Sequence, residues 1–545
     1  MKFIPEGPPR FKHQTRALRK MIETRGIAAL LYEPGTGKTC PTLDYCSLLA
    51  LKAPEREARV LVIAPLAALD TWVLQAETYA HHAVDVWAEV VGGSIRQRAE
   101  SLAARGGSPF KRGLPRSHGH KRSPALWTRQ QGKGVHGAQT DLLDRPQPAQ
   151  PRLVLCALGL SSFSSRAAVG SKTMADVMVD AVRRFRPDLV VIDESHLIKS
   201  PSSNASRAVA RITPIAPRRI ILTGTVMPHS PLDVFAQWRF LQPHAFGSHS
   251  KPATFGGFKN RYAVMGGFMG REAVSFHRLD EMQDIMARNA VVATKADSLD
   301  LPPTMDTVVP VHLSPRESTA YAEMKSDLAA QLESGDLVTV PNRLAQMMRL
   351  RQITSGYLPS EDGEVRQVGD SKAKAIRSVV NESLAGEKRV VIFAHFRPEI
   401  AKLAEVLTEK GTEVVTITGD TPSPQRQTIR ARFGSDDPAR IVLIAQTRTM
   451  SLAVNELVTA SHAIFASLPL TRDDHEQARA RLDRNGQTRP VTFWYAAAPG
   501  SVDEVIMKAH RERTNLEKAV MAHIAGSEVS LDEWQSSTAS AQENQ

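Results

Sequence analysis

Cysteine and long apolar runs are both scarce in this sequence of 545 residues. Its three cysteines, Cys40, Cys46 and Cys156, show no Cys-x-x-Cys spacing. This spacing argues against a disulfide framework or a cysteine-based zinc site, and it favours a reducing interior. No apolar run approaches the roughly 18 residues that a membrane-spanning helix needs, and the first residues lack the apolar core of a signal peptide. We therefore expect a cytoplasmic chain with no membrane partner.

Acidic residues are fewer than basic ones, 57 against 69, which gives a formal net charge of +12. This excess permits a polyanionic partner but does not choose among nucleic acid, nucleotide and a membrane surface. Hydrophobic residues make up 42% and charged residues 23% of the chain. That is an ordinary globular composition, and it excludes a mostly disordered chain.

Short, almost continuously apolar runs alternate with helical patterns through most of the chain. Such runs are typical of strands in a parallel sheet that is covered on both faces. They predict an α/β fold with two domains, residues 1–245 and 371–525. The expected strands are residues 28–31, 60–63, 153–156, 189–192 and 219–222 in the first domain, and 390–393, 414–417, 441–444 and 463–465 in the second.

The segments outside these two domains have a different character. Residues 246–370 are expected to be a connecting region of helices and loops, with helical apolar spacing at 279–286 and 344–353. Residues 105–150, which begin at Arg105, are rich in glycine, proline and basic side chains and predict a flexible insertion. Residues 526–545 are polar, and we expect a disordered tail.

A glycine-containing segment between an expected strand and an expected helix predicts a phosphate-binding loop. Glycines let backbone N–H groups close around phosphate oxygens at a helix N-terminus. The lysine of such a loop reaches the β- and γ-phosphates, and the next hydroxyl serves a magnesium ion. The strict pattern has glycine where Tyr32 stands, so a simple glycine turn is the alternative. The loop residues are Gly35, Thr36, Gly37, Lys38 and Thr39.

An acidic pair, Asp193 and Glu194, ends the apolar run at residues 189–192. Alone, such a pair is usually a loop or a helix cap. With a phosphate loop upstream, we expect Asp193 to hold magnesium and Glu194 to polarise the attacking water. His196 completes this four-residue segment, and we expect it to have a coupling role.

Together these residues resemble helicase superfamily 2, and within it the SWI/SNF-related helicase-like ATPases. Further segments carry the resemblance in the order of the family's motifs, except in residues 105–150 and the tail. They are residues 11–14, 64–66 with Trp72, 222–225 with Pro228, 295–302, 343–352, 393–396, 418–420 with Arg426 and Phe433, and 477–487.

The resemblance implies two RecA-like P-loop NTPase lobes with helical, family-specific insertions. It implies ATP and Mg²⁺ as cofactors, with Gln14 reading the adenine. Thr223 and Thr225 belong to the motif that links the ATP state to DNA binding. The implied partner is duplex DNA, held mainly through phosphates, which extends the expected location to the nucleoid, or to a host cytoplasm if the protein is viral. Protein partners stay unknown.

The last motif contains Gln477, Arg481 and Arg484, which stand at i, i+4 and i+7. On a helix these residues share one face, which could present two guanidinium groups to a triphosphate. A planar, permanently charged guanidinium suits the charge that develops in phosphoryl transfer. A solvated basic helix face is the alternative interpretation.

Two departures from the family's pattern stand out. Ser195 occupies a position where the family commonly has alanine. The run from Met450 to Leu457 has Ser451 and Ala453 in place of glycines, and Glu456 intrudes after Asn455. A loop that depends on glycine dihedral angles would be altered, which casts doubt on how tightly ATP use is coupled to movement on DNA.

The function expected from the sequence is an ATP-dependent motor that translocates on or remodels double-stranded DNA. A strand-separating helicase is one alternative. Another is a DNA-binding accessory protein that uses ATP binding as a switch with little turnover. A metabolic P-loop kinase fails to explain Gln477, Arg481, Arg484 and the second α/β domain. The basic segment 105–150 is either a DNA-contacting loop or a solvated surface loop.

Overall fold

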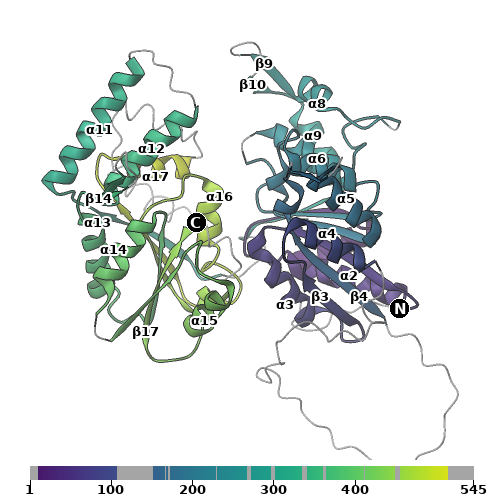
Figure 1. The fold of residues 1–545 in the computed structure, drawn as a ribbon, viewed down its shortest axis with the longest axis horizontal. Helices are drawn as coiled ribbons and strands as arrows, with labels where there is room; N and C mark the ends of the chain where they lie inside the picture. The colour runs from purple at the N-terminus through teal and green to yellow at the C-terminus, as the bar shows by residue number, and fades with distance from the viewer. Residues whose placement is uncertain are drawn as a thin grey trace, which may run out of the picture. The chain divides into compact units, whose positions relative to one another are not determined.

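The computed structural model divides the chain into two compact units, Met1–Ser298 and Leu299–Gln545 (Figure 1). It describes residues 10–106, 151–165, 167–169, 172–228, 230–248, 250–266, 272–295, 301–333, 340–359, 364–409, 411–447 and 455–512. The expected tail and residues 107–150 of the expected insertion lie outside these ranges. Among the described residues, no helix is long and apolar enough to cross a membrane.

The first unit is built on a seven-stranded sheet in which every pairing is parallel. Its strand order is β11-β1-β8-β7-β2-β4-β3. The strands in chain order are β1 (Ile27–Tyr32), β2 (Glu57–Ala64), β3 (Asp85–Val90), β4 (Arg152–Gly159), β7 (Leu189–Asp193), β8 (Arg219–Thr223) and β11 (Ala290–Ala293).

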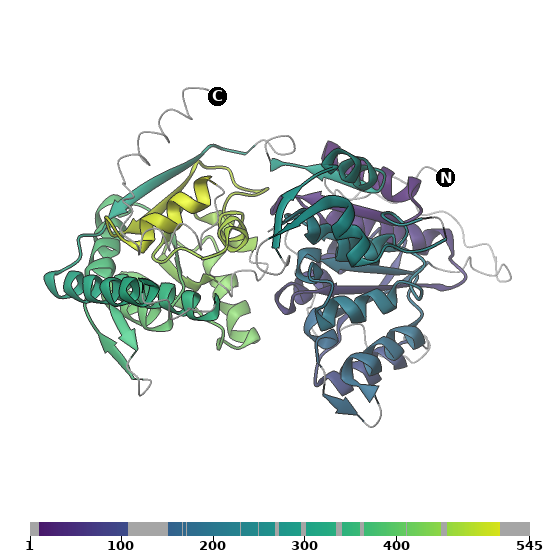
Figure 2. The ribbon, with the colours of Figure 1, turned by 90° about the horizontal axis from the view of Figure 1, so that it is seen from above.

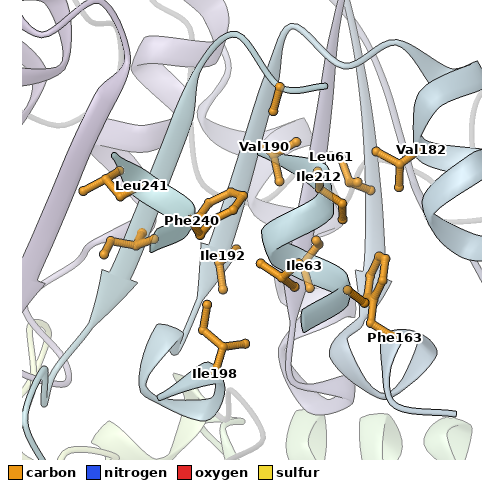
Figure 3. Packing of buried hydrophobic residues seen from close by; sticks show 14 of the residues in the cluster. Leu61, Ile63, Phe163, Val182, Val190, Ile192, Ile198, Ile212, Phe240 and Leu241 are labelled. Atoms are coloured by element: carbon orange, nitrogen blue, oxygen red, sulfur yellow. The ribbon is translucent and has the colours of Figure 1, made fainter. Parts of the chain in front are cut away.

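Helices cover both faces of this sheet, so alternate strand residues enter two separate cores. Leu61, Ile63, Val190 and Ile192 point into one core, against Ile212 and its neighbours (Figure 3). The helices on that face are α4 (Ile95–Ala104), α5 (Met174–Phe185), α6 (Asn204–Ile212) and α7 (Val234–Leu241). The helices on the other face are α1 (Lys12–Glu23), α2 (Thr39–Lys52) and α3 (Leu69–Tyr79).

Smaller elements complete the first unit. Phe258 and Tyr262 of α8 and Met282 and Met286 of α9 extend the core on the α7 side of the sheet. Two short antiparallel pairs lie outside the main sheet. These elements are α8 (Phe255–Tyr262), α9 (Leu279–Ala287), the pair β9 (Ala263–Gly266) and β10 (Glu272–Phe276), and the pair β5 (Ala168–Val169) and β6 (Lys172–Thr173).

The second unit contains a six-stranded parallel sheet with the order β12-β19-β18-β15-β17-β16. Its strands are β12 (Thr304–Pro310), β15 (Arg389–Ala394), β16 (Thr412–Ile417), β17 (Arg440–Gln446), β18 (His462–Phe465) and β19 (Val491–Ala497). The antiparallel hairpin of β13 (Tyr357–Pro359) and β14 (Val365–Gln367) projects from this unit (Figure 2).

Two cores again flank the sheet. Helices α13 (Ser371–Ser378) and α14 (Arg397–Leu407) pack on one side. The opposite core receives side chains from the remaining helices, which are α11 (Pro315–Glu333), α12 (Val340–Thr354), α15 (Ser423–Phe433), α16 (Arg472–Arg479) and α17 (Val502–Glu512).

The structure confirms all nine expected strands and the expected helices at 279–286 and 344–353, which are α9 and α12. It differs in residues 246–370, which add β11 to the first sheet and β12 to the second. Both strands lie at a sheet edge and are partly exposed. Polar residues interrupt β12, and β11 is an apolar run of four residues, which by pattern alone fits a helix as well as a strand. The division between the units therefore falls at residue 298.

The structure also differs from the prediction at Arg105, which was expected to begin the flexible insertion. It follows the last residue of α4 and forms an ion pair with Glu89 of β3 at 2.6 Å. Its guanidinium lies 5.5 Å from the centre of the Trp87 ring. The insertion therefore begins after this anchored residue.

A buried ion pair fastens α13 to α17 in the second unit. Lys372 Nζ lies 2.7 Å from Asp503 Oδ2, and both side chains are at most 5% exposed. Thr354 of α12 donates its hydroxyl to Asp503 Oδ1 at 3.2 Å. A buried charge that loses its partner costs much more than the intact pair contributes, because its desolvation is no longer compensated.

Asp503→Ala is therefore expected to lower the free energy of unfolding by about 3–5 kcal/mol. Lys374→Ala on the same helix is the matched control, because its pair with Asp370 is largely exposed and should contribute at most about 1 kcal/mol. Urea unfolding followed by circular dichroism measures both. Equal effects of the two substitutions would contradict the assignment of Lys372–Asp503 as a structural anchor.

Candidate active site

Three loops carrying the predicted motifs lie side by side at one edge of the first sheet. Strand β8 lies between β1 and β7, and all three run parallel. Their carboxyl ends therefore meet at the same edge, which is where open α/β sheets bind ligands. The loops that follow them begin at Glu33, Glu194 and Gly224.

The predicted phosphate loop has the expected strand–loop–helix form, running from β1 into α2. Gly35 and Gly37 have φ angles of +92° and +82°, a region that glycine enters without a Cβ penalty. The Thr36 hydroxyl donates to the Glu33 carbonyl at 2.8 Å. Helix α2 begins at Thr39, so its free N–H groups and positive dipole end face the loop.

Lys38 connects this loop to the acidic segment. Its Nζ donates to the Tyr32 carbonyl at 3.3 Å and lies 3.7 Å from Glu194 Oε1. The Lys38 side chain is 11% exposed. The structure therefore places the ammonium group between the phosphate loop and the carboxylate that sequence reasoning assigned as the base.

Helix α1 fixes the other side of the loop. Gln14 Nε2 donates to the Gly37 carbonyl at 3.2 Å, and its Oε1 accepts from the Phe11 N–H at 3.2 Å. His13 Nε2 lies 2.8 Å from the Thr36 carbonyl. The Tyr32 hydroxyl donates to the His13 carbonyl at 2.6 Å. Tyr32, which departs from the strict motif, thus ties α1 to the strand that leads into the loop.

Asp193 is the last residue of β7, and its carboxylate is held on both oxygens. Trp72 Nε1–H donates to Oδ2 at 2.9 Å, and the Glu194 N–H donates to Oδ1 at 3.0 Å. Burial, followed by the negative charge of Glu194, raises the pKa of Asp193 above its ordinary value. The Lys38 charge and the Trp72 N–H act in the opposite direction.

Glu194 adopts a left-handed backbone conformation, with φ +51° and ψ +54°. It is one of four non-glycine residues with positive φ in the described part of the chain. Such a conformation costs about 1–2 kcal/mol for a side chain without special stabilisation, and this kind of strain concentrates at functional sites. Here it allows the Glu194 carboxylate to face Lys38 and His196 at once.

His196 connects the acidic segment to the loop after β8. Its Nδ1 lies 3.2 Å from Glu194 Oε2 and 3.2 Å from Thr223 Oγ1. The Thr223 hydroxyl donates to the Thr225 carbonyl at 3.1 Å and accepts from the Thr225 N–H at 3.1 Å. The structure therefore brings together Lys38, Glu194, His196, Thr223 and Thr225, as sequence reasoning expected of one site.

The last predicted motif lies in the second unit, and its geometry differs from the prediction. Gln477 is helical, but α16 ends at Arg479, so Arg481 and Arg484 do not continue its face. The chain turns there to bury Leu482 completely. The Gln487 amide fixes the turn by donating to the Leu482 carbonyl at 3.3 Å and to the Ala460 carbonyl at 2.9 Å.

Arg479 is a structural arginine within the same motif. Its guanidinium lies 4.0 Å from the centre of the Phe493 ring and contacts Asp306 and the Tyr495 hydroxyl. These contacts join α16 to β12 and β19. The spacing of the motif could not show that Arg479 is structural whereas Arg481 was predicted to act on the triphosphate. This distinction depends on which sheet residues each arginine faces.

The structure shows the contacts of Glu456, the residue that intrudes into the family's pattern. Residues 448–454, which include Met450, Ser451 and Ala453, lie outside the described ranges. Glu456 forms a two-pronged ion pair with Arg430 of α15, with both distances 3.1 Å. A Cβ at Gly434 would lie 2.9 Å from Glu456 Cβ. The intruding carboxylate is therefore packed closely against α15.

Sequence reasoning missed the roles of Trp72 and Gln237. Trp72 belongs to a motif that was recognised, but its bond to Asp193 depends on β2 lying next to β7. Gln237 of α7 accepts a hydrogen bond from the Ser195 hydroxyl at 2.7 Å. No local pattern marks either contact, because each joins segments at least 40 residues apart.

Trp72→Phe should lower the free energy of unfolding by about 1.5–3 kcal/mol, the range for a hydrogen bond to a charged group. Trp87→Phe is the matched control, since the Trp87 indole N–H has no hydrogen-bond partner among the described residues. Urea titration of the two variants gives the comparison. If Trp87→Phe destabilises the protein as much, the Trp72–Asp193 bond contributes nothing beyond ring packing.

The chain matches two family models. The SNF2-related domain matches residues 13–356, more than half of the chain, and the helicase conserved C-terminal domain matches residues 371–486. The DNA annealing helicase and endonuclease ZRANB3 of Bos taurus is 26% identical over 345 residues, covering 61% of this chain and 30% of that protein. An uncharacterized ATP-dependent helicase of Mycoplasma genitalium is 24% identical over 374 residues, covering 66% and 34%.

Among solved structures, the SWI2/SNF2 ATPase core of Sulfolobus solfataricus in complex with double-stranded DNA is similar. It is 18% identical and has a TM-score of 0.38, with 96% of this chain and 95% of that chain covered. The chain spans about a third of the length of the curated relatives named above. Family membership implies the use of ATP. With its two RecA-like α/β units, the chain belongs to the SNF2-related, SWI/SNF-type branch of the superfamily 2 helicase-like ATPases.

Proposed function

We propose that this chain is a motor that hydrolyses ATP and uses it to translocate on or remodel double-stranded DNA. The observation that carries the proposal is the contact sequence from Lys38 through Glu194 and His196 to Thr223. It connects a phosphate loop, a carboxylate base and a second loop without a break. A switch protein with little turnover would not need a carboxylate held in a strained conformation beside the phosphate loop.

The residues at the first site fit a magnesium nucleotide. The N–H groups of residues 35–39 and the Lys38 ammonium suit phosphate oxygens. The Thr39 hydroxyl and the Asp193 carboxylate are the hard oxygen ligands that Mg²⁺ prefers. When bound, Mg²⁺ would neutralise charge on the phosphates. Trp72 keeps the Asp193 carboxylate oriented toward this role. Gln14, fixed on the phosphate loop, would contact the adenine.

Glu194 would orient and polarise the attacking water, because its carboxylate is 22% exposed and flanked by two proton-bearing groups. Lys38 faces one carboxylate oxygen, and His196 faces the other. Arg481 and Arg484 would supply positive charge to the triphosphate during phosphoryl transfer, and the neutral amide of Gln477 would contact the nucleotide through hydrogen bonds. Arg479 has no part in this, because Asp306, Tyr495 and Phe493 occupy its guanidinium.

Duplex DNA is the proposed track. The net charge of +12 suits a polyanion, and relatives in the same family are named as DNA helicases and chromatin-remodelling factors. Contacts to phosphates would make binding weakly sequence-specific and strongly dependent on salt. The path from His196 to Thr223 and Thr225 would transmit the state of the nucleotide to the DNA-contacting loops.

ATP turnover measured without nucleic acid, and with duplex DNA, single-stranded DNA or RNA, tests this function. We expect duplex DNA to give the largest stimulation and added salt to reduce it, because salt competes with phosphate contacts. Greater stimulation by single strands would favour a strand-separating helicase. If no nucleic acid raises the rate, the motor proposal is wrong.

Arg481→Ala should reduce kcat by about 10³-fold, the lower range for an arginine that stabilises phosphoryl transfer. Its ATP affinity should change little, because the guanidinium acts mainly in the transition state. Arg472→Ala is the matched control, since Arg472 begins α16 and forms a partly exposed pair with Glu476. Steady-state kinetics and nucleotide binding decide the assignment, and an unaffected kcat for Arg481→Ala would refute it.

A further inference from the structure

A second connection runs from the acidic segment to the loop after β8, separate from the one through His196. Ser195 lies between Glu194 and His196, and its side chain is completely buried. Its hydroxyl donates to Gln237 Oε1 at 2.7 Å. Gln237 is also completely buried, in the middle of α7. Two buried polar side chains thus bond to each other at a helix whose Val234, Trp238 and Leu241 belong to the apolar core.

The amide of Gln237 is a junction of three chain segments. Its Nε2 donates to the Val226 carbonyl at 2.7 Å and to the Asp233 carbonyl at 3.0 Å. Val226 directly follows Thr225 in the loop after β8, and Asp233 precedes α7. One side chain therefore fixes the distance between the segment that contains Glu194 and the loop that contains Thr225.

Stability alone does not require this polar junction. Burying an amide and a hydroxyl costs free energy that their hydrogen bonds largely return, so two apolar groups of similar shape would be nearly as stable. A satisfied buried network instead enforces one geometry, because any displacement leaves a polar atom unpaired.

We propose that Gln237, acting through Ser195 and Val226, is a positioning residue that couples the Glu194 segment to the loop carrying Thr223 and Thr225. A shift of that loop on binding DNA would move Ser195, and with it the Glu194 carboxylate. This inference rests on the proposed DNA-dependent ATPase function. It adds a second link to the one that His196 makes.

The test is the double variant Ser195→Ala with Gln237→Leu in the full-length protein. It removes both partners of the Ser195–Gln237 bond together, so no hydroxyl is left facing an apolar group, and it takes the amide donor away from the Val226 and Asp233 carbonyls. Thr213→Val is the matched control. The Thr213 hydroxyl is buried and donates at 3.4 Å to the carbonyl of Phe240, which lies on α7 as Gln237 does. Among the described residues, the hydrogen bonds of Thr213 do not reach the acidic segment. Ser195→Ala alone, which adds no volume, serves as a second variant if the double variant folds poorly.

We expect the double variant to have a somewhat lower urea midpoint, because the Val226 and Asp233 carbonyls lose a donor, and to keep the half-maximal DNA concentration of the unchanged protein. Its stimulation by duplex DNA, expressed as the ratio of stimulated to unstimulated kcat, should fall about fivefold, within the range for coupling residues. Ser195→Ala should lower the ratio in the same direction, and Thr213→Val should leave it unchanged. If the stimulation ratio falls only in proportion to the urea midpoint, in the double variant and in Ser195→Ala alike, the junction has a packing role alone and the inference is overturned.

Full stimulation of the double variant would likewise overturn the inference and leave the proposed function intact. Absence of stimulation in the unchanged protein would overturn the proposed function itself, and with it this inference. Measuring the stimulation of the unchanged protein first therefore tells the two failures apart.

Discussion

The adjacency of β1, β8 and β7 in the first sheet is the constraint on which the site depends. Parallel pairing brings their carboxyl ends to one edge, and helices on both faces prevent any strand from slipping by one residue. A one-residue slip would turn the strand's buried side chains to the opposite face. Because this register is fixed, the ammonium of Lys38 and the carboxylate of Glu194 meet at 3.7 Å, although 156 positions separate the two residues in the chain.

The electrostatics of the site follow from placing two carboxylates side by side at a buried edge. Burial and mutual repulsion favour the protonated form of Asp193. Trp72, Lys38 and the Glu194 N–H stabilise its charged form instead. Specific hydrogen-bond donors and the Lys38 charge, rather than solvent, therefore stabilise the negative charge of Asp193. The same arrangement allows a small displacement of the acidic segment to change its chemistry, because each donor acts over hydrogen-bond distance.

Much of this structure could be predicted from sequence, for a physical reason. Central parallel strands are apolar on both faces, so 60–63 and 189–192 are visible as runs, and the phosphate loop lies between a strand and a helix. The edge strands β11 and β12 are half-exposed. Polar residues interrupt β12, and the four apolar residues of β11 can belong to a helix or a strand by pattern alone. The end of α16 was missed because it depends on the burial of Leu482 and on the bond from Gln487 to the Ala460 carbonyl. The spacing of Gln477, Arg481 and Arg484 cannot show either contact. The bonds of Trp72 and Gln237 likewise depend on strand order and helix placement.

The central claim is that Glu194 activates water while Lys38 holds the phosphates. The most direct measurement compares ATP binding with single-turnover hydrolysis for Glu194→Gln and Lys38→Ala. We predict that Glu194→Gln binds ATP with near-normal affinity and fails to hydrolyse it, because the amide keeps the shape but cannot accept a proton. Lys38→Ala should also lose hydrolysis, and with it affinity for the phosphates. Hydrolysis at the unchanged rate in Glu194→Gln, or loss of its ATP binding, would contradict the assignment of Glu194 as the base.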